Sequence, residues 1–247
     1  QADYVMDEDV TRSCEQNWGV VAEGENNFAV TLSRMAGDLL PERPEARILD
    51  LNADTGRLAF ELAKNFSDVT ALGFTARMIR VPIQLQEQGY VRYTMKDEGE
   101  LLFYRDVVLG DYGLSDTKEH ILFLQADAMN LKPIFNGYDL IILPNLLEEL
   151  SDPLLFLANI HTRMNNRGYL LLASSYEWDP ERTPRDRWPG GFKRDGEPVT
   201  SLDGIRETLT PRFTLCREPE EITLNLKKST RTSEQRRVQV TIWKKSE

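Results

Sequence analysis

Short apolar runs alternate with amphipathic stretches along most of the chain. A short apolar run bounded by turn residues is typical of a buried strand, and apolar residues spaced by three or four are typical of a helix. Runs of the first kind predict strands at residues 46–51, 68–74, 120–128, 138–147 and 167–176. Stretches of the second kind predict helices at residues 56–66, 76–89, 152–164 and 201–209. This alternation is typical of parallel strands that are connected by helices.

The pattern changes near the C-terminus. Residues 213–226 and 236–245 predict two strands with no helix between them, and strands joined in this way pair antiparallel. We therefore expect an α/β fold with a doubly wound, mostly parallel sheet and an antiparallel C-terminal strand. This is the arrangement of the Rossmann-like class I methyltransferase fold, an analogy that concerns the fold and not the function.

Three segments fall outside the alternation. Residues 1–45 are expected to form an N-terminal helical cap, residues 90–119 a β-hairpin insertion, and residues 177–200 a long loop on the substrate side. A loop of that length is usually functional or disordered, and its tryptophans and phenylalanine favour an ordered loop. Because no repeat or linker divides the sequence, we expect residues 1–247 to form a single methyltransferase-like domain.

Composition limits the classes of partner. The 247 residues are 40% hydrophobic and 28% charged, which suffices for one sizeable core. The formal net charge of −10 repels nucleic acids and anionic membranes. No secretory signal is visible, and no apolar run approaches the roughly 20 residues that span a bilayer. We therefore expect a cytoplasmic protein with a small-molecule substrate, and neither nucleic acid nor membrane as a partner.

The turn after the first predicted strand is the first candidate site. Ligands of doubly wound sheets bind at the carboxyl ends of the strands, where a glycine-rich turn lets the backbone approach them. The usual methyltransferase turn has an acid followed by glycines at alternate positions, and these positions are Asp50, Asn52, Asp54 and Gly56 here. Asn and Asp adopt positive φ more readily than other side chains, so the turn can keep its backbone shape. The alternative is an ordinary strand-to-helix turn without a ligand.

The ends of the next strands provide the other cofactor candidates. Gly73 and Phe74 follow the second strand, where S-adenosylmethionine sites usually have an acid for the ribose hydroxyls. Losing a hydrogen bond to a charged acceptor costs roughly 1.5–3 kcal/mol. Asp127 and Ala128 follow the third strand and can bind adenine, and Asn145 follows the fourth, where the methyl group would be transferred. Each of these residues is also a plausible turn or cap residue.

The segment 177–200 and its flanks contain distinctive motifs. They are Tyr-x-Trp at 176–178, Thr-Pro-Arg at 183–185, Trp-x-Gly-Gly-Phe-Lys at 188–193 and Asp-Gly-Glu-Pro-Val-Thr at 195–200. With these motifs, and with shorter matches between residues 74 and 147, the chain resembles the methyltransferase domain of ovothiol synthases. The resemblance to these 4-mercaptohistidine N-methyltransferases covers roughly residues 46–245.

This resemblance implies an S-adenosylmethionine-dependent transferase that methylates an imidazole nitrogen of 5-thiohistidine, a small thiol-imidazole. It also implies a partner, because in the fused enzymes this domain follows an iron-dependent sulfoxide synthase. Tyr176, Trp178 and Trp188 are the candidates for an apolar, cation-tolerant wall of the substrate site. The substrate carboxylate would be bound by Lys193, Arg185 or Arg187. The alternative is a surface loop packed by its own aromatic side chains.

The sequence departs from the same family on the cofactor side. Family members have glycine at the position of Asn52, a small residue at that of Asp54, and Asp at that of Gly73. These departures indicate weak, altered or absent binding of S-adenosylmethionine, unless Glu23 or Glu25 replaces the missing acid. Three interpretations stay open: an active methyltransferase, an inactive pseudo-methyltransferase that serves as a binding, regulatory or dimerisation module, and a nucleotide-binding protein with another reaction.

Other chemistry has less support in the sequence. Zinc, phosphate-loop and Cys-x-x-Cys motifs are missing, so no metal site is predicted. No catalytic side chain is predicted either, because proximity and orientation can supply most of the acceleration for an electron-rich imidazole. The adjacent pair Glu148 and Glu149 is interpreted as a solvent-exposed face or a turn.

Overall fold

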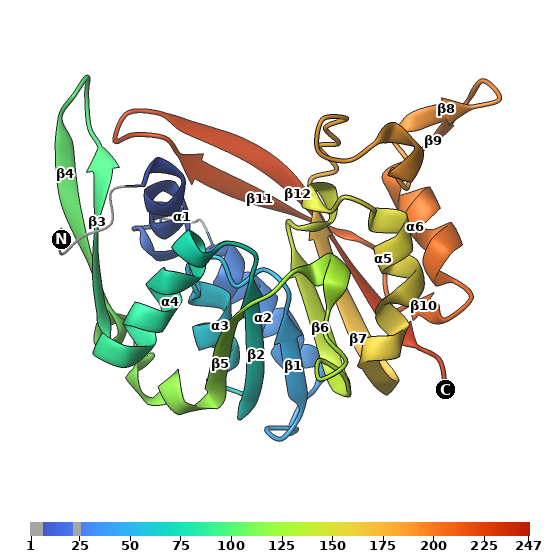
Figure 1. Ribbon diagram of the computed structural model, residues 1–247, viewed down its shortest axis with the longest axis horizontal. Helices are drawn as coiled ribbons and strands as arrows, with labels where there is room; N and C mark the ends of the chain where they lie inside the picture. The colour runs from blue at the N-terminus through green and yellow to red at the C-terminus, as the bar shows by residue number, and fades with distance from the viewer. Residues whose placement is uncertain (1–6, 22–25) are drawn as a thin grey trace. The chain divides into compact units, whose positions relative to one another are not determined.

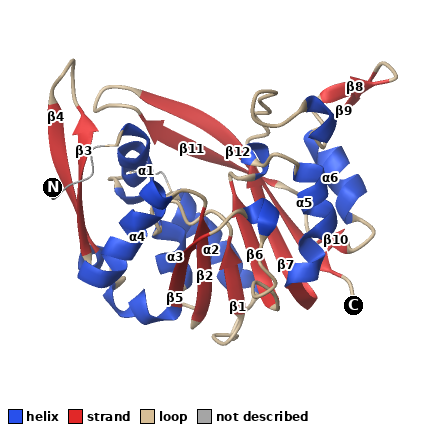
Figure 2. Ribbon diagram, in the orientation of Figure 1, coloured by secondary structure: helices blue, strands red, loops and turns tan. Residues whose placement is uncertain are grey.

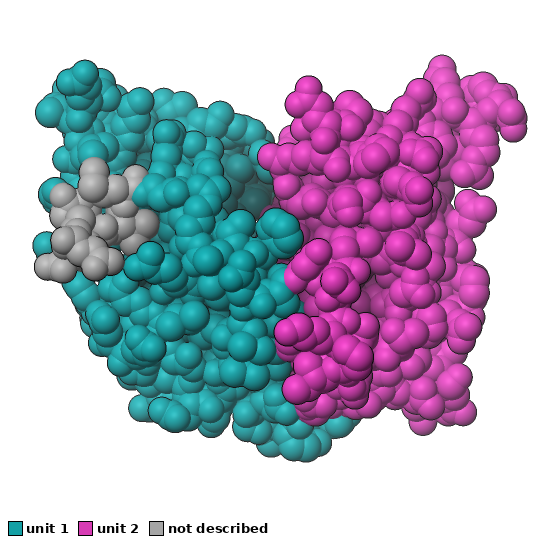
Figure 3. Space-filling model, viewed as in Figure 1, with its two compact units in different colours: residues 1–46, 53–126, 223–236 teal, residues 47–52, 127–222, 237–247 magenta. Residues whose placement is uncertain are grey.

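The computed structural model describes residues 7–21 and 26–247 (Figure 1). Contacts divide the chain into two compact units that interleave along the sequence (Figure 3). The first unit comprises residues 1–46, 53–126 and 223–236, and the second comprises residues 47–52, 127–222 and 237–247. The prediction of a single methyltransferase-like domain over residues 1–247 stays a prediction.

The first unit contains helices and, besides residues 223–236, two separate pairs of strands. Its α-helices are α1 (Glu8–Trp18), α2 (Phe28–Leu39), α3 (Arg57–Leu62) and α4 (Ala76–Gln88), and its 3₁₀ turns are η1 (Leu109–Tyr112) and η2 (Ser115–His120). Strands β2 (Asp68–Gly73) and β5 (Ile121–Gln125) pair in parallel. Strands β3 (Tyr90–Lys96) and β4 (Leu102–Val108) form an antiparallel hairpin, coloured green in Figure 1.

The second unit contains most of the strands. In the order β10-β12-β7-β6-β1 they are β10 (Phe213–Leu215), β12 (Ser233–Lys245), β7 (Met164–Ser174), β6 (Tyr138–Pro144) and β1 (Arg47–Asp50). Strand β11 (Glu220–Lys227) pairs with β12, and the distal part of this hairpin, residues 223–236, belongs to the first unit. A small separate hairpin consists of β8 (Phe192–Arg194) and β9 (Glu197–Val199).

Two α-helices of the second unit lie side by side, α5 (Pro153–Asn159) and α6 (Ser201–Leu209), as Figure 2 shows. The 3₁₀ turns of this unit are η3 (Ala128–Asn130), η4 (Leu147–Glu149), η5 (Ile160–Arg163) and η6 (Arg185–Arg187). Helix α6 begins with a capping box, in which Thr200 and Asp203 exchange side-chain and backbone hydrogen bonds. The helix predicted over residues 152–164 consists of α5 and the 3₁₀ turn η5, which follows it directly.

The predicted fold class is confirmed. Strands β1, β6 and β7 are parallel neighbours, whereas β12 is antiparallel to β7 and β10 is antiparallel to β12. Residues 140–143 of β6 and 170–173 of β7 are buried on both faces, which explains their continuous apolar runs. No helix in the described ranges, 7–21 and 26–247, is long and apolar enough to cross a membrane.

One local prediction needs correction. The strand predicted over residues 213–226 is divided into β10 and β11, and the interruption includes Pro219, which has no N–H to donate to a strand ladder. Pro82 lies inside α4. Its ring packs against Gly56, where a Cβ would lie 2.5 Å from the Cβ of Pro82.

Candidate functional site

The carboxyl ends of β1 and β6 bring together three of the predicted residues in the second unit. Asp50 ends β1, is fully buried, and accepts a hydrogen bond at Oδ1 from the Asn52 backbone N–H at 3.0 Å. The Asn52 side chain turns to β6, where Nδ2 donates to the carbonyl oxygen of Pro144 at 3.0 Å. The next residue, Asn145, donates its backbone N–H to the carbonyl oxygen of Ala173 at 2.7 Å. The side chain of Asn52 thus forms a hydrogen bond that joins the end of β1 to the end of β6.

Asn145 has the strongest local signature of a binding residue. Its φ is +47°, a backbone conformation that is uncommon outside glycine and that concentrates at functional sites. Its side-chain oxygen Oδ1 is buried and has no hydrogen-bond partner in the part of the chain that the structure describes. A buried acceptor without a donor costs about 1–3 kcal/mol, which a ligand N–H would recover.

The turn 53–56 lies in the first unit and keeps the backbone shape expected of a glycine-rich turn. Asp54 has a φ of +49° and Gly56 a φ of +93°. The Gly56 N–H closes the turn by donating to the carbonyl oxygen of Ala53 at 2.7 Å. The expectation that Asp can adopt the glycine conformation is confirmed at Asp54, whereas Asn52 does not have a positive φ.

The carboxylate of Asp54 binds helix α1. Oδ1 accepts from the Ser13 hydroxyl, and Oδ2 accepts from Nδ2 of Asn17 at 3.1 Å. Burial raises the pKa of the Asp54 carboxyl, and the hydrogen bonds from Ser13 and Asn17 oppose that rise. The indole N–H of Trp18 donates to the carbonyl oxygen of Thr55 at 3.0 Å. The charge that Asp54 adds to the turn is therefore engaged by the N-terminal helix.

The end of β2 has a glycine, Gly73, where the resemblance implies an acid, and the aromatic residue Phe74 follows it. A Cβ at Gly73 would lie 2.9 Å from Cδ1 of Ile79, so an acidic side chain requires the Ile79 side chain to shift. Phe74 is 67% exposed, and its carbonyl oxygen accepts from Nε2 of Gln125 at 3.1 Å. Glu23 and Glu25, the proposed replacements for the acid, lie outside the described residues.

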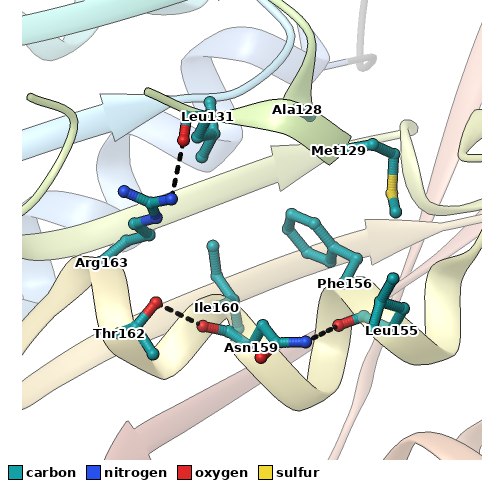
Figure 4. A pocket seen from close by; sticks show the side chains of 9 residues that line it. All are labelled: Ala128, Met129, Leu131, Leu155, Phe156, Asn159, Ile160, Thr162 and Arg163. Atoms are coloured by element: carbon teal, nitrogen blue, oxygen red, sulfur yellow. Dashed lines mark hydrogen bonds between the residues drawn. The ribbon is translucent and has the colours of Figure 1, made fainter. Parts of the chain in front are cut away.

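Asp127 and Ala128 lie at the start of η3, in the second unit. Asp127 is exposed, and its Oδ1 accepts from the Met129 N–H at 2.9 Å, as a helix cap does. Ala128 and Met129 border a cavity of about 280 Å³ that follows α5 and η5 (Figure 4). Its other lining residues are Leu131, Leu155, Phe156, Asn159, Ile160, Thr162 and Arg163. The guanidinium of Arg163 donates a hydrogen bond to the carbonyl oxygen of Leu131 at 2.7 Å. With this cation engaged, the lining of the cavity is largely apolar.

The segment 177–200 is packed by its own aromatic side chains. The rings of Trp178 and Trp188 stack with centroids 6.1 Å apart, and both indoles are half-buried. Their N–H groups donate within the unit, to Oγ of Ser201 at 2.8 Å and to the carbonyl oxygen of Thr183 at 2.7 Å. A Cβ on Gly190 would overlap the Thr200 carbonyl oxygen, so this glycine fits the segment tightly onto the start of α6.

The cationic candidates of this segment lie in different surroundings. Arg185 is exposed in η6, and Lys193 is exposed in β8, opposite Pro198. Neither side chain makes a hydrogen bond or ion pair with a residue that the structure describes. Both are thus accessible to an anionic group, but the structure does not join them to the tryptophans. Arg187 is instead paired with Asp152 at 2.5 Å.

Tyr176 follows β7 and has the strained φ of +56°. Its hydroxyl donates to Oε1 of Gln239 at 3.0 Å. Burial raises the pKa of the Tyr176 phenol, and the charges of Glu148 and Glu221 raise it further. Tyr176 is therefore a neutral hydrogen-bonding group at any physiological pH.

Glu148 is a residue that the sequence analysis misinterpreted. It is 6% exposed, and it accepts from the Ser174 hydroxyl at 2.7 Å and from the Ser175 hydroxyl and N–H at 2.8 and 3.0 Å. The interpretation of Glu148 as solvent-exposed is therefore wrong, whereas Glu149 is exposed as expected. The pair of serines at the end of β7 was the available sequence signal for this buried acceptor.

The fold and the residues at its strand ends define a Rossmann-like α/β protein whose candidate ligand groups follow the carboxyl ends of its strands. A family model described as "Methyltransferase domain" matches residues 25–210, so the chain belongs to that family. A search of curated protein sequences found no significant match. In the described ranges of the chain, no group of three or more His, Cys, Asp or Glu residues is placed to hold a metal ion.

Solved structures share the fold at low sequence identity. The N-methyltransferase NodS from Bradyrhizobium japonicum WM9, in complex with S-adenosyl-L-homocysteine, is 15% identical with a TM-score of 0.54, over 96% of this chain and 99% of NodS. A TehB-like SAM-dependent methyltransferase from Corynebacterium glutamicum ATCC 13032 Kitasato is 17% identical with a TM-score of 0.51, over 90% of each chain. The [4+2]-cyclase SpnF is 15% identical with a TM-score of 0.57, over 93% of this chain and 86% of SpnF. This likeness concerns the fold, which is compatible with more than one activity.

Proposed function

We propose that the chain is an S-adenosylmethionine-dependent N-methyltransferase that acts on a small thiol-imidazole of the 5-thiohistidine type. The observation that carries the proposal is membership of the methyltransferase domain family. The matched residues 25–210 include every strand end at which a cofactor residue was predicted, from Asp50 to Asn145. The preserved left-handed backbone of Asp54 and Gly56 supports a ligand at the turn.

Each proposed cofactor contact uses a group that is free to make it. When bound, S-adenosylmethionine supplies an electrophilic methyl group on its sulfonium. The exposed carboxylate of Asp127 would accept from the adenine amino group, and the backbone N–H of Ala128 would donate to the ring. The exposed ring of Phe74 offers an apolar surface to the nucleoside. The buried Oδ1 of Asn145 would accept a ligand N–H.

The substrate assignment rests on the motifs of residues 176–200 and their resemblance to ovothiol synthases. Tyr176, Trp178 and Trp188 would form the wall of the site, with the exposed Arg185 or Lys193 as a partner of the amino-acid carboxylate. The protein would hold the imidazole nitrogen in line with the sulfonium and exclude water, and proximity would supply most of the acceleration. A sulfoxide synthase domain or protein would supply the thiolated substrate.

A second candidate function is favoured by the end of β2. Gly73 provides no carboxylate for the ribose hydroxyls, and Ile79 occupies the space that its Cβ would need. A pseudo-methyltransferase could keep this packing and act as a binding, regulatory or dimerisation module. The two functions differ in cofactor affinity, because the loss of the ribose acceptor without replacement weakens binding by about tenfold to hundredfold.

Calorimetric titration with S-adenosylmethionine and S-adenosylhomocysteine separates the two functions. Micromolar dissociation constants, followed by methyl transfer to 5-thiohistidine in a mass-spectrometric assay, are the results expected of the methyltransferase. Absence of binding at millimolar ligand would refute it and favour the module. Phe74→Ala should weaken binding, whereas Tyr104→Ala, which removes another exposed aromatic ring, should leave it unchanged.

A further inference from the structure

Helix α1 is hydrogen-bonded to the turn 53–56 at successive positions. The Ser13 hydroxyl and Asn17 Nδ2 donate to the two carboxylate oxygens of Asp54. Asn17 Nδ2 also lies 3.3 Å from Oγ of Ser13, which links the two donors. At the residue after Asn17, the Trp18 indole N–H donates to the Thr55 carbonyl oxygen at 3.0 Å. The helix therefore contacts both the side chain and the backbone of the turn.

These contacts compensate for a residue that is poorly suited to its position. Asp54 has a φ of +49°, which glycine adopts without strain and a residue with a Cβ does not. Burial also disfavours the charged form of its carboxylate, so the group needs hydrogen-bond donors. Ser13 and Asn17 supply those donors, and they do so only while Asp54 keeps the left-handed conformation that directs its side chain to α1.

We propose that Ser13 and Asn17 are positioning residues of the cofactor turn, which hold Asp54 in the conformation that glycine would adopt unaided. The role of this turn in cofactor binding rests on the proposed function; the hydrogen bonds of α1 to the turn do not. The positioning makes the shape of the turn depend on a helix that lies about 40 residues earlier in the sequence.

Helix α1 has other attachments that keep it in place when the contacts to Asp54 are removed. Its buried Glu15 accepts from the Tyr93 hydroxyl at 2.6 Å and pairs with Arg105 at 2.9 Å. At its start, Asp7 and Asp9 pair with Arg77 at 2.8 and 3.0 Å. Substitution of Ser13 should therefore release the turn while α1 stays folded against the hairpin β3–β4.

A set of variants tests the positioning role through S-adenosylhomocysteine affinity. Ser13→Ala should raise the dissociation constant by about tenfold, the loss expected when a hydrogen bond to a charged group is removed. Asp54→Gly should bind within about threefold of the unmodified protein, because glycine takes positive φ without help. In the Asp54→Gly background, Ser13→Ala should have no further effect. Arg12→Ala, on the exposed face of α1 where it pairs with Glu8, is the matched control and should bind normally.

A readout without cofactor separates failure of this proposal from failure of the proposed function. The Gly56 amide, which donates to Ala53 within the turn, should exchange with solvent at least tenfold faster in Ser13→Ala than in the unmodified protein, by NMR. The difference should vanish in the Asp54→Gly background. If the unmodified protein does not bind S-adenosylhomocysteine, the proposed function fails and the exchange rates still decide the positioning role. The positioning role would be overturned if the Gly56 amide exchanged in folded Ser13→Ala and Asn17→Ala variants at the rate of the unmodified protein. An effect of Ser13→Ala that persists undiminished in the Asp54→Gly background would overturn it as well.

Discussion

Gly73→Asp tests whether packing keeps an acid from the end of β2. A Cβ at this position would lie 2.9 Å from Cδ1 and 3.2 Å from Cβ of Ile79. Ile79 is only 4% exposed, so it must move within packed surroundings to admit the new side chain. Overpacking of this kind costs about 1–3 kcal/mol. We expect Gly73→Asp to lower the free energy of unfolding by that amount in urea denaturation.

The second substitution in this experiment is Ile79→Val, which removes the Cδ1 methyl that makes the shortest contact. Ile79→Val alone should lower the free energy of unfolding by roughly 0.5–1.5 kcal/mol. Because the two residues share one contact, the double variant should be more stable than the sum of the single effects predicts, by ~0.5–1 kcal/mol. Ile205→Val, at a buried helical isoleucine of the second unit, is the matched control and should be additive with Gly73→Asp.

The same double variant has an expected gain in affinity. If the cofactor binds as proposed, the new carboxylate accepts hydrogen bonds from the ribose hydroxyls, each contributing roughly 1.5–3 kcal/mol. Calorimetry should then find S-adenosylhomocysteine bound about tenfold to hundredfold more tightly than by Ile79→Val alone. Additive stabilities would refute the packing argument. Unchanged affinity in a folded double variant would refute the position of the ribose at the end of β2.

Three further predictions concern stability and pH. Gly204→Ala in α6 should destabilise the protein in thermal unfolding, because its Cβ would overlap the backbone carbonyl of Pro189. Gly37→Ala in α2 is the matched control: its Cβ has room, so the substitution should stabilise the protein by about 0.5–1 kcal/mol. Glu148→Ala leaves buried serine donors without an acceptor and should cost about 1–3 kcal/mol in urea denaturation, with Glu148→Gln less harmful. The hydrogen bond from Arg77 lowers the pKa of Asp7, so the stability that this pair contributes is present above pH 3.8 and is lost as the pH falls below that value. Carboxyl NMR should find a higher Asp7 pKa in Arg77→Ala than in the unmodified protein, although the backbone N–H groups of Val10 and Asp9 still lower it.

The parallel part of the fold could be predicted because its strands are buried on both faces. Ile141 and Leu171 belong to runs in which every residue is apolar and buried, which is the pattern of strands that are covered on both faces. The division of residues 213–226 was not predicted, because the apolar pattern continues past Pro219 while the hydrogen-bond ladder does not. Periodicity reports burial, and it does not report which backbone groups are paired.

The partners of the candidate site residues were less predictable than the residues themselves. The position of Glu148 after a strand suggested a turn, and its burial depends on serines 26 and 27 residues away in the sequence. In the same way, nothing near Asp54 indicates that its charge is bound by Ser13, 41 residues earlier. Contacts of this length are set by the packing of whole elements, which a single sequence does not specify.

The departures from the usual methyltransferase turn have a common physical explanation. Asn52 bonds the end of β6, Asp54 bonds α1, and Gly73 makes room for Ile79 of α4. Each residue has a partner inside its own unit, so each departure fits the packing of this chain, and a missing motif residue is weak evidence that binding has been lost. The evidence for activity must come from groups that packing does not use, which are the exposed Phe74 ring, the exposed Asp127 carboxylate and the buried Oδ1 of Asn145. An unpaired acceptor such as this Oδ1 costs free energy in the absence of a donor, and a ligand N–H at this position would recover that cost.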